Sequence, residues 1–241
     1  MIQFDRVGVT VETPTGARPI LAGVSADLVE RRIAVIGDNG SGKSTLLRLI
    51  NGLVKPTSGT VTVDGLDVAR QTKAVRARVG FVFTDALTQL LTPTPIEDIE
   101  LSLRRLVPDK TERRRRAVAL LDRAGLGNLA HASIYDLSSG ERQVVALISV
   151  LAVDPAIVVA DEPTTLLDRR RRAEWRARLN QLDQQVVLAT HDLGLAAAMD
   201  RGLVLSGGRI VFDGPADQAT RYYRQTTDAA TASDTTRPAD D

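Results

Sequence analysis

Eight consecutive residues near the start of the chain have the types and spacing of a phosphate-binding loop. They run from Gly37 to Ser44 and read G-x-x-x-x-G-K-S. Glycines in such a loop let backbone N–H groups converge on a phosphate chain, and the N-terminus of the following helix adds a positive dipole end. The lysine of the pattern reaches the β- and γ-phosphates, and the last hydroxyl ligates Mg²⁺.

The surroundings of this motif favour phosphate binding over a tight glycine-rich turn with an incidental lysine. An apolar run, residues 33–36, precedes it, and a helical pattern of apolar residues, 46–50, follows it. Strand, loop and helix in this order are the context that the motif requires. We therefore expect a nucleoside triphosphate, with Lys43 acting in catalysis and Ser44 binding Mg²⁺. The predicted binding residues are Gly37, Asp38, Asn39, Gly40, Ser41, Gly42, Lys43, Ser44 and Thr45.

Two adjacent carboxylates, Asp161 and Glu162, follow another apolar run, residues 157–160. Neighbouring side chains of a strand point to opposite faces, so the pattern predicts different roles for the two acids. Asp161 is expected to hold Mg²⁺ through water, and Glu162 to act as a general base or to position water. Two acids at a strand end need carry no chemistry, but Pro163 and the phosphate-binding loop favour the functional interpretation.

A third motif, residues 137–141 (Leu-Ser-Ser-Gly-Glu), opens an apolar helix. Ser138 and Glu141 have the spacing of a capping box. Hydroxyls, exposed N–H groups and a glycine at a helix N-terminus also form an anion site. The residues alone leave open whether this is a helix cap or a binding site, and the candidate binding residues are Ser138, Ser139 and Gly140.

Composition narrows the class of protein. The chain has 241 residues, 43% of them hydrophobic, a net charge of +1 and no cysteine. These values predict a globular chain without disulfides and give no whole-chain argument for nucleic acid. The N-terminus reads as a strand and not as a signal peptide, and no apolar run approaches the ~20 residues of a membrane helix. Arginine runs at 113–116 and 169–172 lie in helical patterns, where a solvated face is the favoured interpretation over contact with a partner or anionic lipid.

The order of predicted elements gives the fold class. Strands dominate residues 1–85, helices occupy 86–153, and strands and helices alternate over 154–216. Within the helical block, Thr94, Pro95 and Glu97 predict a helix start with a capping box. Residues 226–241 lack apolar periodicity and are expected to form a disordered tail. The chain is thus predicted to be α/β, with residues 1–85 and 154–216 forming a nucleotide-binding core and 86–153 an inserted helical subdomain.

Together these motifs resemble the nucleotide-binding subunit of an ABC (ATP-binding cassette) transporter from about residue 2 to 216. The resemblance implies a P-loop NTPase (RecA-like) core with an N-terminal antiparallel β-subdomain and an inserted α-helical subdomain. Residues 137–141 correspond to the family's signature. Residues 165–168 correspond to its D-loop, and residues 190–192 correspond to its H-switch. It further implies that two cassettes close head to tail on ATP and Mg²⁺, and that His191 contacts the γ-phosphate and orients water against Glu162.

Three positions depart from the family pattern. The signature has Ser139 and Glu141 where Gly and Gln are usual, and Glu141 requires a cation such as Arg142 to offset its charge. Thr84 replaces a glutamine that touches Mg²⁺, so Gln89 or a water must substitute, or coupling is weakened. Val11 stands at the position of an aromatic that stacks on adenine, so apolar contact remains without stacking.

Residues 83–98 resemble the ATPase subunits of energy-coupling-factor importers, which carry vitamins or transition-metal ions, and residues 161–168 resemble the biotin-importer ATPase. The resemblance implies a peripheral protein on the cytoplasmic face of the membrane, an integral-membrane partner and a second ATPase subunit, identical or paralogous, and no nucleic acid. A groove between the helical block and residues 84–94 would receive a short helix of the membrane partner. The alternatives are a soluble ATP-dependent clamp or regulatory module, and a small-molecule kinase.

Overall fold

The computed structural model describes residues 1–234, which divide into two compact units. The first consists of Met1–Arg70 and the described residues from Val187 onward, and the second of Gln71–Val186. The predicted helical block, 86–153, lies wholly in the second unit. Residues 71–85 and 154–186, which were expected to belong to the nucleotide-binding core, cluster with it.

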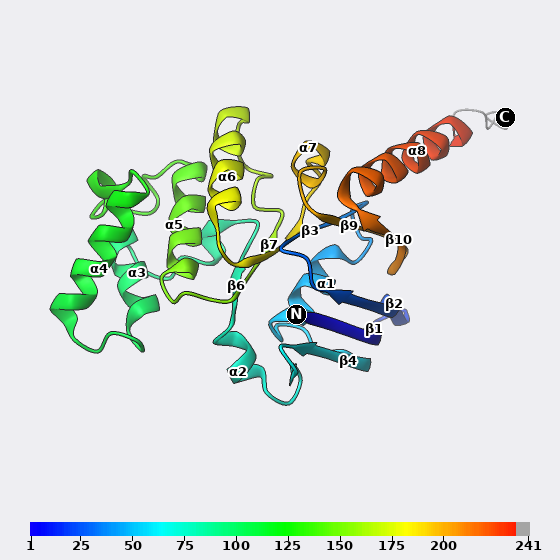
Figure 1. The fold of residues 1–241 in the computed structure, drawn as a ribbon, viewed down its shortest axis with the longest axis horizontal. Helices are drawn as coiled ribbons and strands as arrows, with labels where there is room; N and C mark the ends of the chain where they lie inside the picture. The colour runs from blue at the N-terminus through cyan, green and yellow to red at the C-terminus, as the bar shows by residue number, and fades with distance from the viewer. Residues whose placement is uncertain (235–241) are drawn as a thin grey trace. The chain divides into compact units, whose positions relative to one another are not determined.

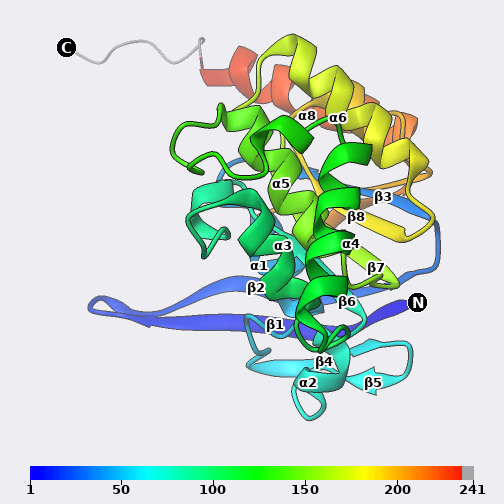
Figure 2. The same ribbon diagram turned by 90° about the vertical axis from the view of Figure 1, so that its left-hand side faces the viewer.

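An antiparallel sheet forms one part of the first unit, as expected for the N-terminal segment. Its strand order is β2-β1-β4-β5, and Figure 2 shows the β1–β2 ribbon extending well past β4. Residues Ile2, Phe4, Val7 and Val9 are buried, so the apolar side chains of β1 form the inner face of this sheet. The strands are β1 (Ile2–Thr13), β2 (Gly16–Leu28), β4 (Ser58–Val63) and β5 (Leu66–Asp67).

Strand β3 (Arg32–Gly37) leads into the phosphate-binding loop and has a neighbouring strand on each side. All six of its residues are buried, which explains its continuous apolar pattern. It pairs in parallel with β9 (Arg201–Ser206), which forms an antiparallel hairpin with β10 (Arg209–Pro215). On its other side β3 neighbours β8 (Gln185–Ala189). The helices α1 (Lys43–Ile50) and α7 (Leu193–Ala196) follow β3 and β8.

The last helix of the first unit, α8 (Ala216–Asp234), is absent from the sequence-based prediction. It lies beside β9 and β10 in Figure 1. The expectation of a disordered tail from residue 226 is therefore wrong for residues 226–234, while 235–241 lie outside the described residues. The helix continues because no Pro or Gly interrupts residues 216–234, and the Thr226 and Thr227 hydroxyls donate to carbonyls one turn back.

The second unit combines two parallel strands with the helical block. Strand β6 (Val79–Val82) pairs in parallel with β7 (Ile157–Asp161). The helices are α2 (Thr72–Arg76), α3 (Pro95–Leu103), α4 (Lys110–Arg123), α5 (Ser139–Leu151) and α6 (Arg169–Gln181). Two 3₁₀ turns, Ala86–Thr88 and Gly127–Leu129, complete the chain path.

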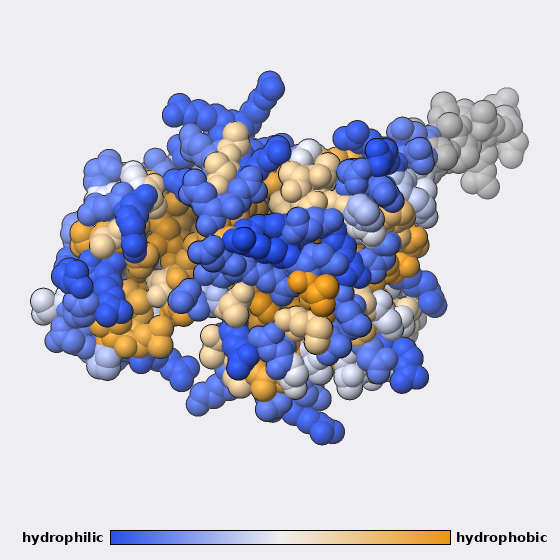
Figure 3. Space-filling model, in the orientation of Figure 1, coloured by the Kyte–Doolittle hydropathy of each residue, from blue (hydrophilic) through white to orange (hydrophobic). Residues whose placement is uncertain are grey.

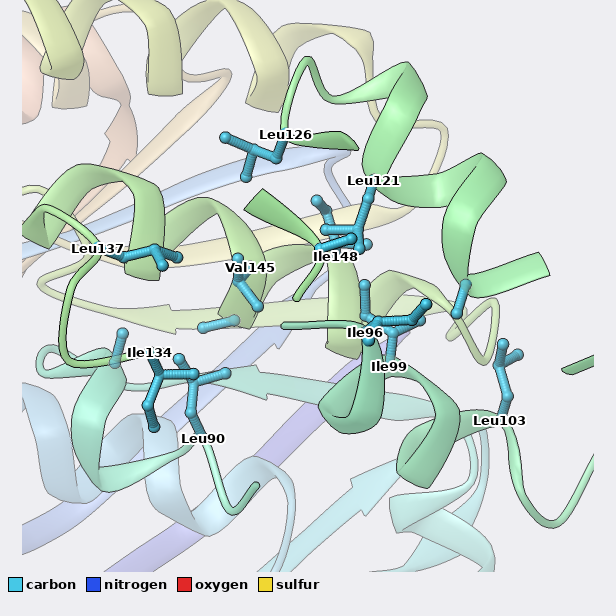
Figure 4. Close-up of a cluster of buried hydrophobic side chains, with 14 of the residues drawn as sticks. Leu90, Ile96, Ile99, Leu103, Leu121, Leu126, Ile134, Leu137, Val145 and Ile148 are labelled. Carbon is cyan, nitrogen blue, oxygen red and sulfur yellow. The ribbon is translucent and has the colours of Figure 1, made fainter. Parts of the chain in front are cut away.

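Helices α3, α4 and α5 share one apolar core, shown in Figure 4. Ile96, Ile99 and Leu121 are almost fully buried there, together with Val145 from α5. Each fully buried aliphatic side chain of this kind contributes roughly 1.5–3 kcal/mol to stability, so the block is held by its own core. Thr94 precedes α3 as expected, but its hydroxyl donates to the Glu97 carboxylate and makes no backbone cap bond, so the predicted capping box is incomplete.

No helix in the described part of the chain has both the length and the apolar composition that crossing a membrane requires.

Candidate functional site

The phosphate-binding loop joins β3 to α1 in the first unit, and two of its glycines are dictated by geometry. Gly37 has φ +149°, and a Cβ there would lie 2.2 Å from the carbonyl oxygen of Leu205. Gly42 has φ +105°, and a Cβ there would lie 2.7 Å from Leu21 Cδ2. A side chain at either position would collide with its neighbours in a conformation that L-residues avoid. The loop therefore needs its glycines for its shape.

Lys43, the first residue of α1, is 6% exposed and faces the loop's own carbonyl groups. Its Nζ donates to the Gly37 oxygen at 2.8 Å and to the Asp38 oxygen at 3.0 Å. The same Asp38 oxygen accepts from the Ser41 N–H at 3.1 Å. The ammonium group thus lies inside the curve of the loop, where an incoming phosphate would meet it. Asn39 and Gly40 are exposed at the loop's tip, and Ser44 and Thr45 are half-buried on α1.

His191 and Val11 are the other two predicted site residues of the first unit. His191 lies two residues after the end of β8 and is exposed. Its neighbours are fixed: Asp192 N–H donates to the Thr190 hydroxyl at 3.0 Å, and the Asp192 carboxylate caps α7. Val11 is 41% exposed on β1, where it pairs with Arg18 of β2. Both therefore present side chains at the surface of their unit.

The two adjacent carboxylates lie in the second unit. Asp161, the last residue of β7, is 1% exposed, and the Thr84 hydroxyl donates to its carbonyl oxygen at 2.8 Å. Glu162 is 9% exposed and has φ +49°. The strand ends at Asp161, so the alternation of a strand does not extend to Glu162, which stands in a left-handed turn. The Thr165 hydroxyl donates to its Oε2 at 3.2 Å and holds the carboxylate in place.

The signature segment forms the N-terminus of α5, and the predicted capping box is present. Ser138 is the N-cap: its hydroxyl oxygen accepts from the Glu141 N–H at 3.3 Å, while Glu141 Oε2 accepts from the Ser138 N–H at 2.8 Å. The Ser139 hydroxyl donates to the Leu166 carbonyl at 3.0 Å, which links the signature to the segment before α6. A Cβ at Gly140 would lie 2.2 Å from Arg171 Cδ, so a side chain there would force Arg171 to move.

Arg171, and not Arg142, is the cation that faces Glu141. The Arg171 Nη2 lies 3.9 Å from Glu141 Oε1. Arg142 instead donates to the Leu137 carbonyl at 2.6 Å, because its side chain turns back along the segment before the helix. Hydrogen bonds from the hydroxyl and N–H of Ser138, with Arg171 adding a smaller attraction, hold the pKa of the Glu141 carboxyl below 4.5. Glu141 is therefore a capping carboxylate as well as a signature residue.

Gln89 does not take over the role of the missing glutamine at position 84. Its Oε1 accepts from the Phe83 N–H at 3.0 Å, and its Nε2 donates to the Ala146 carbonyl at 3.2 Å. Both ends of the amide thus tie the end of β6 to α5, and the expectation that Gln89 substitutes is not supported by its geometry. Thr84 itself contacts the strand end that carries Asp161.

One contact of the phosphate-binding loop was invisible to sequence reasoning. The Tyr223 hydroxyl of α8 donates to Asp38 Oδ1 at 2.7 Å. The two residues are 185 positions apart, and no motif marks Tyr223, so only the fold could reveal it. Arg171 was likewise read as one member of a solvated arginine run.

The donor chemistry of the predicted metal ligands fits Mg²⁺. The candidates are the Ser44 hydroxyl and the Asp161 carboxylate, both hard oxygen donors. The described residues contain no group of three or more His, Cys, Asp or Glu side chains arranged around one metal position. Mg²⁺ suits such a sparse set, since it keeps several waters and uses one or two protein ligands together with substrate phosphates.

A phosphate-binding loop after a buried parallel strand, with an acidic strand end and a capped signature helix, defines a nucleotide-binding cassette. The ABC transporter family matches residues 21–165, and the chain belongs to this family. It is an ATP-binding subunit and an ATPase, and the predicted fold class and recognition are confirmed.

Relatives and a solved structure agree with this assignment. The chain is 42% identical over 224 residues to a biotin transport ATP-binding protein of Rhizobium etli, covering 93% of this chain and 98% of that one. It is 33% identical to an energy-coupling factor transporter ATP-binding protein of Methanospirillum hungatei (84% and 53% covered) and 38% identical to a cobalt import ATP-binding protein of Syntrophus aciditrophicus (81% and 72%). A dimeric ATP-binding cassette in a post-hydrolysis state with ADP and Pi aligns with TM-score 0.80 and 31% identity, covering 90% and 99%.

Proposed function

We propose that this chain is the ATPase subunit of an energy-coupling-factor importer and that its substrate is biotin. The single observation that carries the proposal is the 42% identity to a biotin transport ATP-binding protein across nearly the full length of both chains. A transition-metal ion is the second candidate substrate, favoured by the similarity to a cobalt import protein. The substrate does not touch an ATPase subunit, so the difference between these candidates lies in the membrane partner.

In this proposal each of the predicted site residues has one role in hydrolysis. Lys43 and the loop N–H groups bind the triphosphate, and Ser44 and Asp161 hold Mg²⁺, which supplies charge neutralisation at the phosphates when bound. Glu162 accepts a proton from the attacking water, and His191 positions that water at the γ-phosphate. Ser138, Ser139 and Gly140 complete the site of a second cassette, identical or paralogous, through head-to-tail closure.

A hollow in the second unit supports docking of a membrane partner on the cytoplasmic face. It has a volume of about 230 Å³ and is lined by residues of β6, α3 and α5 and of the loop before α3. Leu91 and Leu101 border it and are 76% and 41% exposed, while Asp98 is buried at its base, held by the Ser149 hydroxyl at 2.8 Å. Figure 3 shows apolar surface among charged residues over α3 and α4. A short partner helix with apolar residues and a cation would match this hollow.

The test is substrate uptake by a reconstituted complex. The chain is co-expressed with the integral-membrane proteins encoded beside it, purified in detergent and placed in liposomes with ATP inside or outside. ATP-dependent accumulation of labelled biotin supports the proposal, and accumulation of Co²⁺ but not biotin supports the second candidate. Recovery of the chain with soluble proteins alone would contradict a transport function and favour an ATP-dependent clamp.

Glu162→Gln is the matched control in this assay. The amide has the shape of the carboxylate but accepts no proton, so turnover should fall at least a hundredfold while ATP is retained and the dimer accumulates. Near-normal turnover in that variant would reject the assigned base without affecting the substrate assignment.

A further inference from the structure

Helix α8 is anchored in the first unit by close packing. Ala216 and Ala219 are buried, and Gly202 of β9 leaves no room for a side chain, since a Cβ there would lie 2.4 Å from the Ala219 Cβ. One turn further along, the Tyr222 and Phe212 rings lie 5.2 Å apart. These contacts fix the helix against β9 and β10, so the position of Tyr223 is set by packing that does not involve the phosphate-binding loop.

From this fixed helix, Tyr223 reaches the second residue of the loop. Its hydroxyl donates to Asp38 Oδ1 at 2.7 Å. The backbone oxygen of the same aspartate accepts from Lys43 Nζ, so the carboxylate and the ammonium group belong to neighbouring parts of one loop. Burial and the adjacent Asp38 carboxylate raise the pKa of Tyr223, so the phenol keeps its donor proton at neutral pH.

The packing around the Asp38 side chain leaves its carboxylate free to take more than one orientation. It is exposed and borders a cavity of about 300 Å³ that is also lined by Tyr223, Ser206 and Thr227. The side chain therefore has room to rotate, and the hydrogen bond from Tyr223 selects one orientation. A released carboxylate could turn toward Lys43 and compete with the triphosphate for the ammonium group, or repel the phosphates directly.

We propose that Tyr223 is a positioning residue of the nucleotide site, which holds the Asp38 carboxylate against α8 and thereby keeps Lys43 available to phosphate. The inference rests on the proposed role of the loop in binding ATP. It assigns a function in nucleotide affinity to the C-terminal helix, which lies outside every motif of the sequence.

The test is equilibrium binding of a fluorescent ATP analogue and of ADP to the purified full-length chain. Tyr223→Phe removes only the hydroxyl and should weaken both affinities about fivefold, because one hydrogen bond to a charged group is lost. Turnover at saturating ATP should stay within about twofold, so that KM rises and kcat does not. Tyr222→Phe, which removes a hydroxyl from the preceding residue of the same helix, is the matched control and should bind as the parent does.

A double-mutant cycle separates positioning from packing. In an Asp38→Ala background no carboxylate remains to be held, so Tyr223→Phe should have no further effect on affinity. An undiminished effect in that background, or unchanged affinity in the single variant, would overturn the proposal. Lys43→Ala tests the role of the loop in binding ATP. If that variant binds ATP as the parent does, the proposed nucleotide site is wrong. If Lys43→Ala loses binding and Tyr223→Phe does not, only the proposed role of Tyr223 is rejected.

Discussion

The hydroxyl of Thr84 donates a hydrogen bond to the backbone oxygen of Asp161 at 2.8 Å. The first residue lies just after β6 and the second ends β7, so the bond joins the carboxyl ends of two parallel strands. By sequence, Thr84 departs from the family pattern, because its side chain is too short to reach Mg²⁺ as the usual glutamine does. The geometry indicates instead that Thr84 fixes the strand end on which the proposed metal ligand stands.

Replacing Thr84 by valine should therefore impair hydrolysis. The substitution keeps the shape and leaves the Asp161 oxygen without this donor, at a cost of about 0.5–1.5 kcal/mol of stability. We expect ATPase activity to fall several-fold and the Mg²⁺ concentration for half-maximal activity to rise. Steady-state assays over a Mg²⁺ series measure both. Thr84→Ser retains the hydroxyl and should restore most of the activity; equal losses in the two variants would argue against the bond.

The Glu141–Arg171 pair predicts a coupling between the signature and α6. Arg171→Ala leaves the Glu141 carboxylate without its neighbouring cation in a segment that is proposed to face a triphosphate. Because the pair is partly exposed and 3.9 Å apart, the loss should be small, up to about 1 kcal/mol or fivefold in KM for ATP. In a Glu141→Gln background the same change should have little effect. Comparable effects of Arg171→Ala in both backgrounds would show that the arginine acts through packing on Gly140.

Acid sensitivity should follow from the capping role of Glu141. Its folded-state pKa is lowered, so its contribution to stability is complete above pH 4.5 and is lost as the pH falls below that value. Glu141→Gln keeps a capping acceptor that does not titrate, and its unfolding free energy should vary less with pH in this range. Urea unfolding at pH 3.5 and at pH 6 measures the difference. A parent and variant with parallel pH profiles would contradict the assignment.

Val11 offers a gain-of-function prediction. It is 41% exposed at the proposed adenine position, where it supplies apolar contact without an aromatic face. Val11→Tyr should strengthen ATP binding by about 0.5–1.5 kcal/mol through stacking and raise the preference for ATP over UTP. Competition binding with the two nucleotides tests this. Thr13→Tyr, farther along the same strand, serves as the control, and an equal gain there would show non-specific contact.

The sequence predicted the parts of this molecule that depend on local patterns. The N-terminus was expected to be a strand and forms β1, continuous apolar runs located β3 and β7, and the capping box placed the start of α5 correctly. The features that sequence reasoning missed depend on contacts between residues that are far apart in the sequence, or on backbone conformation. Arg171 reaches Glu141 across 30 positions, Tyr223 reaches Asp38 across 185, and the left-handed turn at Glu162 cannot be read from a residue type that rarely adopts it. The helix α8 was overlooked because its polar composition resembles that of a disordered tail.

The left-handed backbone conformation of Glu162 limits how far the stability of this protein can be raised without loss of turnover. A residue with a Cβ in the left-handed region is disfavoured by about 1–2 kcal/mol, whereas glycine or asparagine tolerates it. Glu162→Gly or Glu162→Asn should therefore raise the thermal stability of the chain while removing the proposed general base. Stability and turnover would then make opposite demands on this one position.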